Sequence, residues 1–112
     1  MRKLIVVSLS ACALVVLTAT AFAATRTIKV GDNYYVRSSG TPTVTVSKGT
    51  TVSWRFAGNA PHNVTVSRGP VKFRSSTRSS GSYRKKVTRR GTYTIYCTVH
   101  GASDQRMKLV VK

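Results

Sequence analysis

Apolar and polar residues alternate along most of the chain after Ala24, and clusters of turn-forming residues interrupt the alternation at short intervals. A period of two places one row of side chains on each face of a β-strand, so this pattern predicts short strands joined by turns. No segment has the periodicity of an amphipathic helix. The sequence therefore predicts one all-β domain, an antiparallel β-sandwich, with strands at residues 27–30, 43–46, 50–56, 62–66, 82–87, 92–97 and 107–111.

The alternation also predicts which side chains face the core. Inward rows are expected at Val52, Trp54 and Phe56, at Tyr93, Ile95 and Cys97, at Met107, Leu109 and Val111, and at His62, Val64 and Val66. In this phase His62, Cys97 and Met107 each lie at the end of an inward row, where side chains from different strands can meet at one pole. Lys85 breaks the rule, because it falls in the inward phase between Tyr83 and Val87. A charge in that position is typical of an edge strand.

Residues 1–23 have the pattern of a secretory signal peptide: Arg2 and Lys3, an uncharged apolar run, and the small residues Ala21 and Ala23 before a cleavage point. The apolar run is shorter than a membrane span, so a retained anchor is disfavoured. Lipidation at Cys12 is disfavoured because apolar sequence continues beyond it. We expect an exported domain of residues 24–112 in the periplasm, the cell envelope or the extracellular space, with no transmembrane span after processing.

The chain is strongly basic, with 19 Lys and Arg against two acidic residues. Asp32 and Asp104 are too few for acid–base hydrolysis or for a hard-cation site. Nine of the cationic residues lie between Arg68 and Arg90. We expect a monomer that meets an acidic or anionic redox partner protein or an anionic envelope surface, although a generally cationic coat explains the same charge. Specific nucleic-acid binding is disfavoured, because the aromatic residues fall mostly in the core phase.

After the leader, the chain contains two histidines, one cysteine and one methionine: His62, Cys97, His100 and Met107. A thiolate, two imidazoles and a weak axial thioether are the donors of a blue-copper electron-transfer site. Structural zinc sites prefer a set richer in strong donors. Attachment of haem requires a second cysteine before the histidine, and a Cys-His hydrolase lacks an evident orienting group here. The donor set therefore indicates one copper ion in a type 1 site.

Three segments resemble the plastocyanin/azurin-like cupredoxins: residues 50–54 (TTVSW), residues 60–64 (APHNV) and residues 91–100 (GTYTIYCTVH), followed by Met107 and a valine-rich strand. The resemblance implies a Greek-key sandwich of about seven to eight strands. It also implies His62, Cys97 and His100 as equatorial ligands and Met107 as the axial one. A further implied feature is an Asn63 side chain that steadies the cysteine loop at Thr98.

One departure from the family pattern concerns the axial ligand. Residues 101–106 separate His100 from Met107, a longer loop than many members have. If this loop swings away, a backbone carbonyl or Gln105 is the alternative axial donor.

The hypothesis is an exported, non-enzymatic carrier of single electrons that cycles between Cu(II) and Cu(I). Two alternatives remain open at the level of sequence. One is a copper storage or delivery protein, and the other is a polyanion-binding module that has lost its metal.

Overall fold

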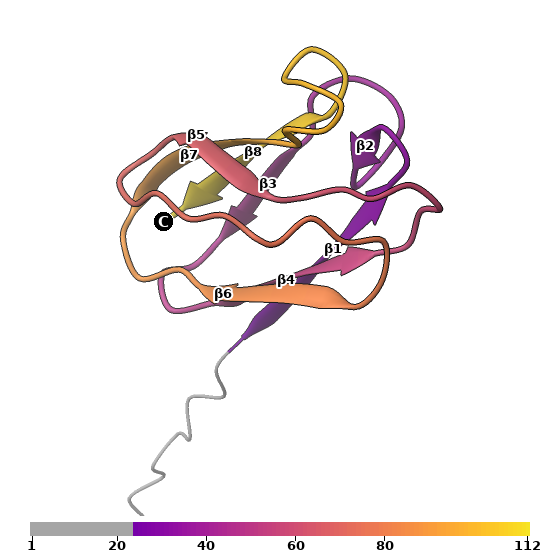
Figure 1. Ribbon diagram of the computed structural model, residues 1–112. Helices are drawn as coiled ribbons and strands as arrows, with labels where there is room; N and C mark the ends of the chain where they lie inside the picture. The colour runs from indigo at the N-terminus through magenta and orange to yellow at the C-terminus, as the bar shows by residue number, and fades with distance from the viewer. Residues whose placement is uncertain (1–23) are drawn as a thin grey trace, which may run out of the picture.

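The computed structural model describes residues 24–112, which form a two-layered β-sandwich (Figure 1). The predicted signal peptide and Cys12 lie outside the described residues. Eight strands follow one another along this part of the chain: β1 (Thr25–Gly31), β2 (Tyr34–Tyr35), β3 (Thr43–Val46), β4 (Thr51–Phe56), β5 (Thr65–Arg68), β6 (Ser82–Lys86), β7 (Gly91–Tyr96) and β8 (Arg106–Val111).

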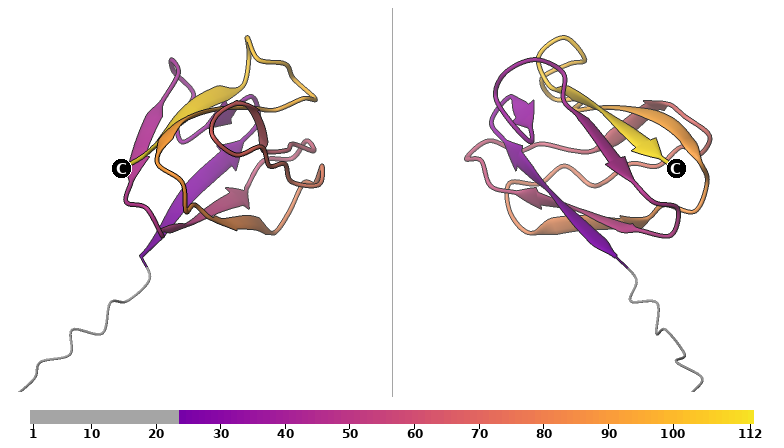
Figure 2. Two further views of the ribbon diagram at one scale, coloured as in Figure 1. Left: turned by 90° about the vertical axis from the view of Figure 1, so that its left-hand side faces the viewer. Right: turned by 180° about the vertical axis from the view of Figure 1, so that it is seen from behind.

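The strands form two sheets of four, with the orders β2-β1-β4-β6 and β3-β8-β7-β5. The two further views in Figure 2 show the sheets stacked face to face. The long connection between β5 and β6 runs beside β5, where Arg74 bridges to Thr65. The predicted all-β sandwich is therefore confirmed. The sheets are mixed rather than purely antiparallel, because β1 pairs with β4 in parallel and β3 pairs with β8 in parallel. Each parallel pair joins strands that are not consecutive in sequence, which the alternation pattern does not reveal.

The core lies between the sheets and consists of the predicted inward rows. Val52, Trp54 and Phe56 of β4 are buried, as are Tyr93 and Ile95 of β7. The buried rows of β1 and β8 complete the core with Ile28, Val30, Met107, Leu109 and Val111. Full burial of each such side chain contributes roughly 1.5–3 kcal/mol, so these rows supply most of the force that joins the two sheets.

Strand β6 lies at an edge of its sheet, as Lys85 predicted. Lys85 is half-buried, and its ammonium lies 5.7 Å from the centre of the Phe73 ring. The charge discourages pairing of this edge with another chain, while the stem covers apolar surface.

The strand predicted at residues 62–66 is only partly regular. Regular pairing with β7 begins at Thr65, whereas His62 makes an isolated bridge to Arg78. The backbone N–H groups of His62 and Arg78 each donate to the other residue's carbonyl, at 3.0 and 2.9 Å. The serine-rich segment 75–81, which lies between the predicted strands 62–66 and 82–87, therefore fixes the backbone of His62. In the part of the chain that the structure describes, no helix is long and apolar enough to cross a membrane.

Candidate metal centre

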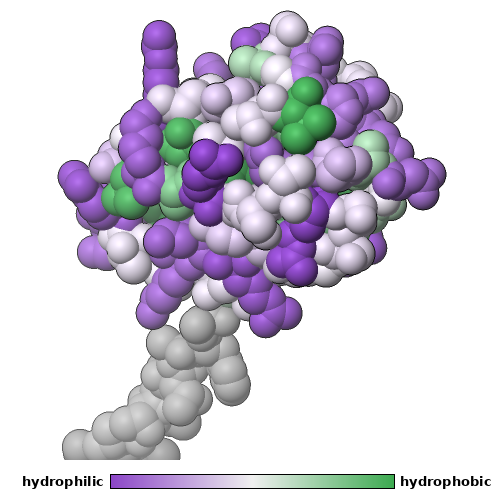
Figure 3. Space-filling model, in the orientation of Figure 1, coloured by the Kyte–Doolittle hydropathy of each residue, from purple (hydrophilic) through white to green (hydrophobic). Residues whose placement is uncertain are grey.

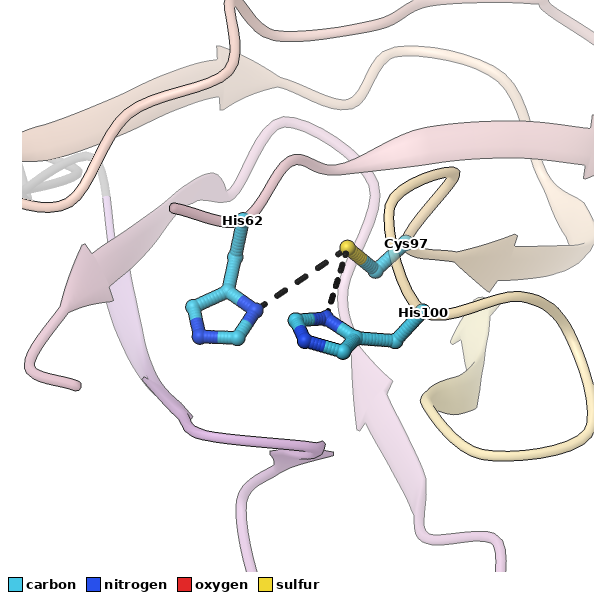
Figure 4. A group of neighbouring side chains, drawn as sticks. All are labelled: His62, Cys97 and His100. Carbon is cyan, nitrogen blue, oxygen red and sulfur yellow. Dashed lines mark hydrogen bonds between the residues drawn. The ribbon is translucent and has the colours of Figure 1, made fainter. Parts of the chain in front are cut away.

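His62, Cys97 and His100 meet at one pole of the sandwich, and their donor atoms all lie within 4.8 Å of one another. Figure 4 shows both imidazole rings turned toward the thiol. The Cys97 sulfur lies 4.0 Å from Nδ1 of His62 and 3.8 Å from Nδ1 of His100. The two ring centres are 4.7 Å apart. His62 and Cys97 are fully buried, whereas His100 is partly exposed.

These distances fit a shared metal ion. Bonds of the length that zinc makes to nitrogen and sulfur, arranged in a trigonal plane, separate the two donors by about 3.8 Å. Both sulfur–nitrogen distances are close to this value. A thiolate with two imidazoles is also the donor set that copper prefers in blue-copper sites. The residues present therefore match such an ion in spacing and in chemistry.

The imidazole of His62 is held from its far side by Asp32, in the turn between β1 and β2. Oδ1 of Asp32 lies 2.8 Å from Nε2 of His62. This contact leaves Nδ1 of His62 free to face Cys97 and sets the orientation of the ring. The hydrogen bond from His62, followed by those from the backbone N–H groups of Asn59 and Ala60, lowers the pKa of Asp32 to about 2. Asp32 is therefore an anion under ordinary conditions.

Sequence reasoning missed this role of Asp32 and treated it as an isolated carboxylate. The contact spans 30 residues, and no local pattern predicts it. Gly58 allows the contact, because a side chain at that position would collide with the Asp32 carboxylate. The chain there follows the carboxylate closely enough for the N–H groups of Asn59 and Ala60 to bind it, at 3.1 and 3.0 Å.

Asn63 connects the His62 segment to the loop that carries the other two donors. Its Nδ2 donates to the Thr98 hydroxyl at 2.6 Å, and its Oδ1 accepts from the Thr98 backbone N–H at 3.1 Å. Further bonds join the Asn63 side chain to Thr77 and Thr65. His62 precedes Asn63 in the sequence and Cys97 precedes Thr98. The bonds between Asn63 and Thr98 therefore fix the spacing between His62 and Cys97.

Tyr35 supports the same segment from the edge strand β2. Its buried hydroxyl donates to the Asn63 carbonyl at 2.5 Å. Burial, with a smaller contribution from Cys97, raises the pKa of the Tyr35 phenol above its usual range. The phenol therefore stays protonated and remains a donor.

Met107 lies on β8, fully buried, and pairs with Ile95 of β7. Its side chain belongs to the inward row, as the alternation predicted. Gln105, two residues earlier, is also fully buried. Its backbone carbonyl accepts from the Cys97 N–H at 3.1 Å.

The matches to known proteins agree with this geometry. The family model described as copper binding proteins of the plastocyanin/azurin family matches residues 24–112. The chain belongs to this family. A plastocyanin from Dryopteris crassirhizoma is 27% identical, over 76% of this chain and 98% of the plastocyanin.

Solved cupredoxin structures have the same fold. A mutant of amicyanin in the Cu(I) state is 28% identical, with a TM-score of 0.66, and the match covers 84% of this chain and 88% of amicyanin. A purple cupredoxin from Nitrosopumilus maritimus is 18% identical, with a TM-score of 0.65 over 78% of this chain and 99% of its own, and shows likeness of fold alone. Copper is accordingly the cofactor of this cupredoxin, and the cluster of His62, Cys97 and His100 fits a type 1 site.

Proposed function

We propose that this cupredoxin is an exported carrier of single electrons, with His62, Cys97 and His100 as the equatorial copper ligands. The observation that carries the proposal is the buried thiol with two imidazoles turned toward it at 3.8 and 4.0 Å. Copper bound by such donors cycles between Cu(II) and Cu(I) and so accepts and releases one electron.

The surrounding residues support electron transfer because they hold the donors in place. Asp32 orients His62, and the Asn63 side chain ties the His62 segment to the cysteine loop. Ligands that are already positioned move little when the charge of the ion changes, which favours fast exchange. A protein that stores or delivers copper instead has to release its ion readily, and these fixed contacts oppose release.

The burial of the donors also indicates the direction from which electrons arrive. His62 and Cys97 are fully buried, so the partly exposed imidazole of His100 is the donor nearest to solvent. Val99, beside it, is 50% exposed. A partner that docks over this end of the sandwich meets the Val99 side chain next to an imidazole edge.

Charge supports an acidic or otherwise anionic partner. The outer face of the sheet β2-β1-β4-β6 carries four exposed cations: Lys29, Arg55, Arg84 and Lys86. The neighbouring residues on this face are hydroxyl-bearing, and it carries no carboxylate. Hydrophilic side chains line the lower edge in Figure 3, where β4 and β6 lie in Figure 1. Complementary charge raises the rate of encounter and is weakened by salt.

The first experiment tests the copper site and its redox role. Residues 24–112 are loaded with Cu(II), and we expect an intense blue band that a reductant bleaches and an oxidant restores. The Cys97→Ala variant should show no such band when it is loaded with Cu(II). A colourless wild type, or a band that persists in the variant, would falsify the proposal. Slow electron self-exchange combined with ready loss of copper to a chelator would favour storage or delivery.

A second experiment tests the charge of the partner with two small reagents. Ferricyanide is an anion and hexaammineruthenium is a cation, so added salt should slow oxidation by the first and not slow reaction with the second. The double variant Arg84→Gln/Lys86→Gln should reduce the salt dependence with ferricyanide. Equal salt dependence for the two reagents contradicts an electrostatic docking face.

A further inference from the structure

The side chain of Gln105, just before β8, is fully buried, and only one end of its amide forms hydrogen bonds. Its Nε2 donates to the backbone carbonyls of Gly31 and Tyr34, at 3.1 and 3.0 Å. Carbonyl oxygens only accept hydrogen bonds, so these two contacts fix which end of the amide is nitrogen. Among residues 24–112, Oε1 has no hydrogen-bond partner although it is buried. A buried acceptor without a donor is destabilising, and such a group points to a ligand.

The strand register places Gln105 directly across from Cys97. Strands β7 and β8 pair Ile95 with Met107 and Tyr96 with Arg106. The next pair in this antiparallel register is Cys97 with Gln105, and the bond from the Cys97 N–H to the Gln105 carbonyl continues the ladder. Side chains directly opposite each other share a face, with Cβ atoms about 4.5–5.5 Å apart.

Met107 occupies the adjacent inward position, one step deeper in the sandwich. It lies opposite Ile95 and packs in the core row with Leu109. Two residues along a strand correspond to roughly 6.6 Å, so the stem of Gln105 is closer to Cys97 than the stem of Met107 is.

The far end of the Gln105 side chain reaches the turn that holds the first histidine. The carbonyls that anchor its amide belong to Gly31 and Tyr34, and Asp32, which hydrogen bonds to His62, lies between them in sequence. Gln105 therefore extends from a position beside Cys97 to the turn that supports His62. Its unpaired oxygen is attached to the same carbon as the anchored nitrogen and is itself buried.

We propose that Oε1 of Gln105, rather than the Met107 thioether, is the axial donor to copper. A glutamine oxygen is an accepted weak axial ligand of type 1 copper. The proposal rests on the three-ligand site of the proposed function and adds its fourth member. Because an amide oxygen is a harder donor than a thioether, it favours Cu(II) over Cu(I). The reduction potential is then lower than it would be with methionine in that position.

The test compares three variants of the copper-loaded domain: Gln105→Met, Gln105→Leu and Met107→Leu. The electron paramagnetic resonance and visible spectra of the Cu(II) form and the reduction potential are measured. We expect both Gln105 variants to change the spectra and to raise the potential. Met107→Leu nearly conserves volume, so it should fold and leave both measurements unchanged.

Each alternative outcome has a separate meaning. A shift in Met107→Leu with none in the Gln105 variants assigns the axial position to methionine and overturns the proposal. No shift in any variant also overturns it, in favour of a backbone carbonyl or an open position. If the Gln105 variants do not fold, which thermal unfolding of the copper-free forms reveals, Met107→Leu still tests the proposal: a spectral shift in it contradicts the proposal, and unchanged spectra support it by excluding methionine from the axial position. A wild type without a blue band instead defeats the proposed function itself.

Discussion

The two halves of the metal centre are built differently. The anchored half comprises residues 58–65, and contacts from distant parts of the chain hold it: Asp32 on His62, Tyr35 on Asn63, and Arg78 on the His62 backbone. The ligand loop comprises residues 97–105, and its own backbone closes it. The N–H of Gly101 donates to the Cys97 carbonyl at 2.9 Å, and that of Gln105 donates to the Gly101 carbonyl at 3.1 Å.

The difference shows how one site combines rigidity with access. The anchored half exists only when the whole sandwich is folded, so its position is as stable as the fold. The ligand loop depends on local turns and carries the partly exposed His100. Asn63 joins the halves through Thr98. We therefore expect substitutions in the anchored half to affect folding and copper together. In the ligand loop, apart from the metal donors, only Thr98 and Gln105 are bonded through their side chains to other parts of the described chain, so substitutions at the exposed positions between them should affect mainly copper.

The largest expected effect is the loss of the blue band when one imidazole is removed, in separate variants, from either half of the site. His62→Gly and His100→Gly should both lose the blue band, because each leaves copper with too few strong donors. Added imidazole should restore the band in His100→Gly at concentrations that leave His62→Gly colourless, since the His62 cavity is closed to solvent. Titration followed by visible absorption measures this, and equal restoration in both would remove the distinction between the halves.

Removing the Asn63 side chain, which joins the two halves, should have the next largest effect, on the stability of the domain. Asn63→Ala removes several buried hydrogen bonds and should lower the free energy of unfolding of the copper-free domain by about 2–4 kcal/mol. The control Thr98→Val removes one hydroxyl partner and should cost about 1 kcal/mol. Urea denaturation measures both. Equal losses in the two variants would mean that Asn63 supports only the ligand loop.

Gly58→Ala tests the close approach of the anchored half to Asp32. The new methyl group collides with the carboxylate, and the strain should cost roughly 1–3 kcal/mol of stability. The cost should fall in an Asp32→Ala background, where the carboxylate is gone and only the tight contact with the backbone nitrogen of residue 32 remains, at 2.9 Å. A double-mutant cycle without coupling would show that the collision is relieved elsewhere.

Tyr35→Phe should have the smallest effect and a distinctive pH dependence. The loss of the hydrogen bond to Asn63 should cost about 1 kcal/mol near neutral pH. Because folding raises the pKa of this phenol, its contribution is present below the unfolded pKa of about 10 and is lost as pH rises above it. Stability measured from pH 8 to 11 should fall less steeply in the variant. Identical slopes would show that Tyr35 ionises alike in both states.

Much of the fold followed from side-chain alternation. The inward rows of β4, β7 and β8 lie where the sequence predicted, because one buried face fixes the phase of a strand. The two-residue strand β2 was missed, since Tyr34 and Tyr35 follow a turn and are too few to show a period. The parallel pairs were also missed, because alternation says which face is buried and not which strand is the neighbour.

The residues of the site also differ in how far the sequence could predict them. His62, Cys97 and His100 could be proposed from donor type, and the phase of their strands brought two of them to one pole. Asp32 could not, because its contact with His62 depends on how two turns meet in space. Gln105 lay between these cases: only the observed register of β7 and β8 places it opposite Cys97.

The unequal exposure of the three donors has a consequence for the life of the protein. His62 and Cys97 are sealed inside, and His100 alone reaches the surface. Under the proposed function, electrons and the metal ion therefore cross the protein surface at the same residue, His100. A partner that covers His100 during electron transfer then also keeps chelators and oxidants from the copper and from the Cys97 thiol.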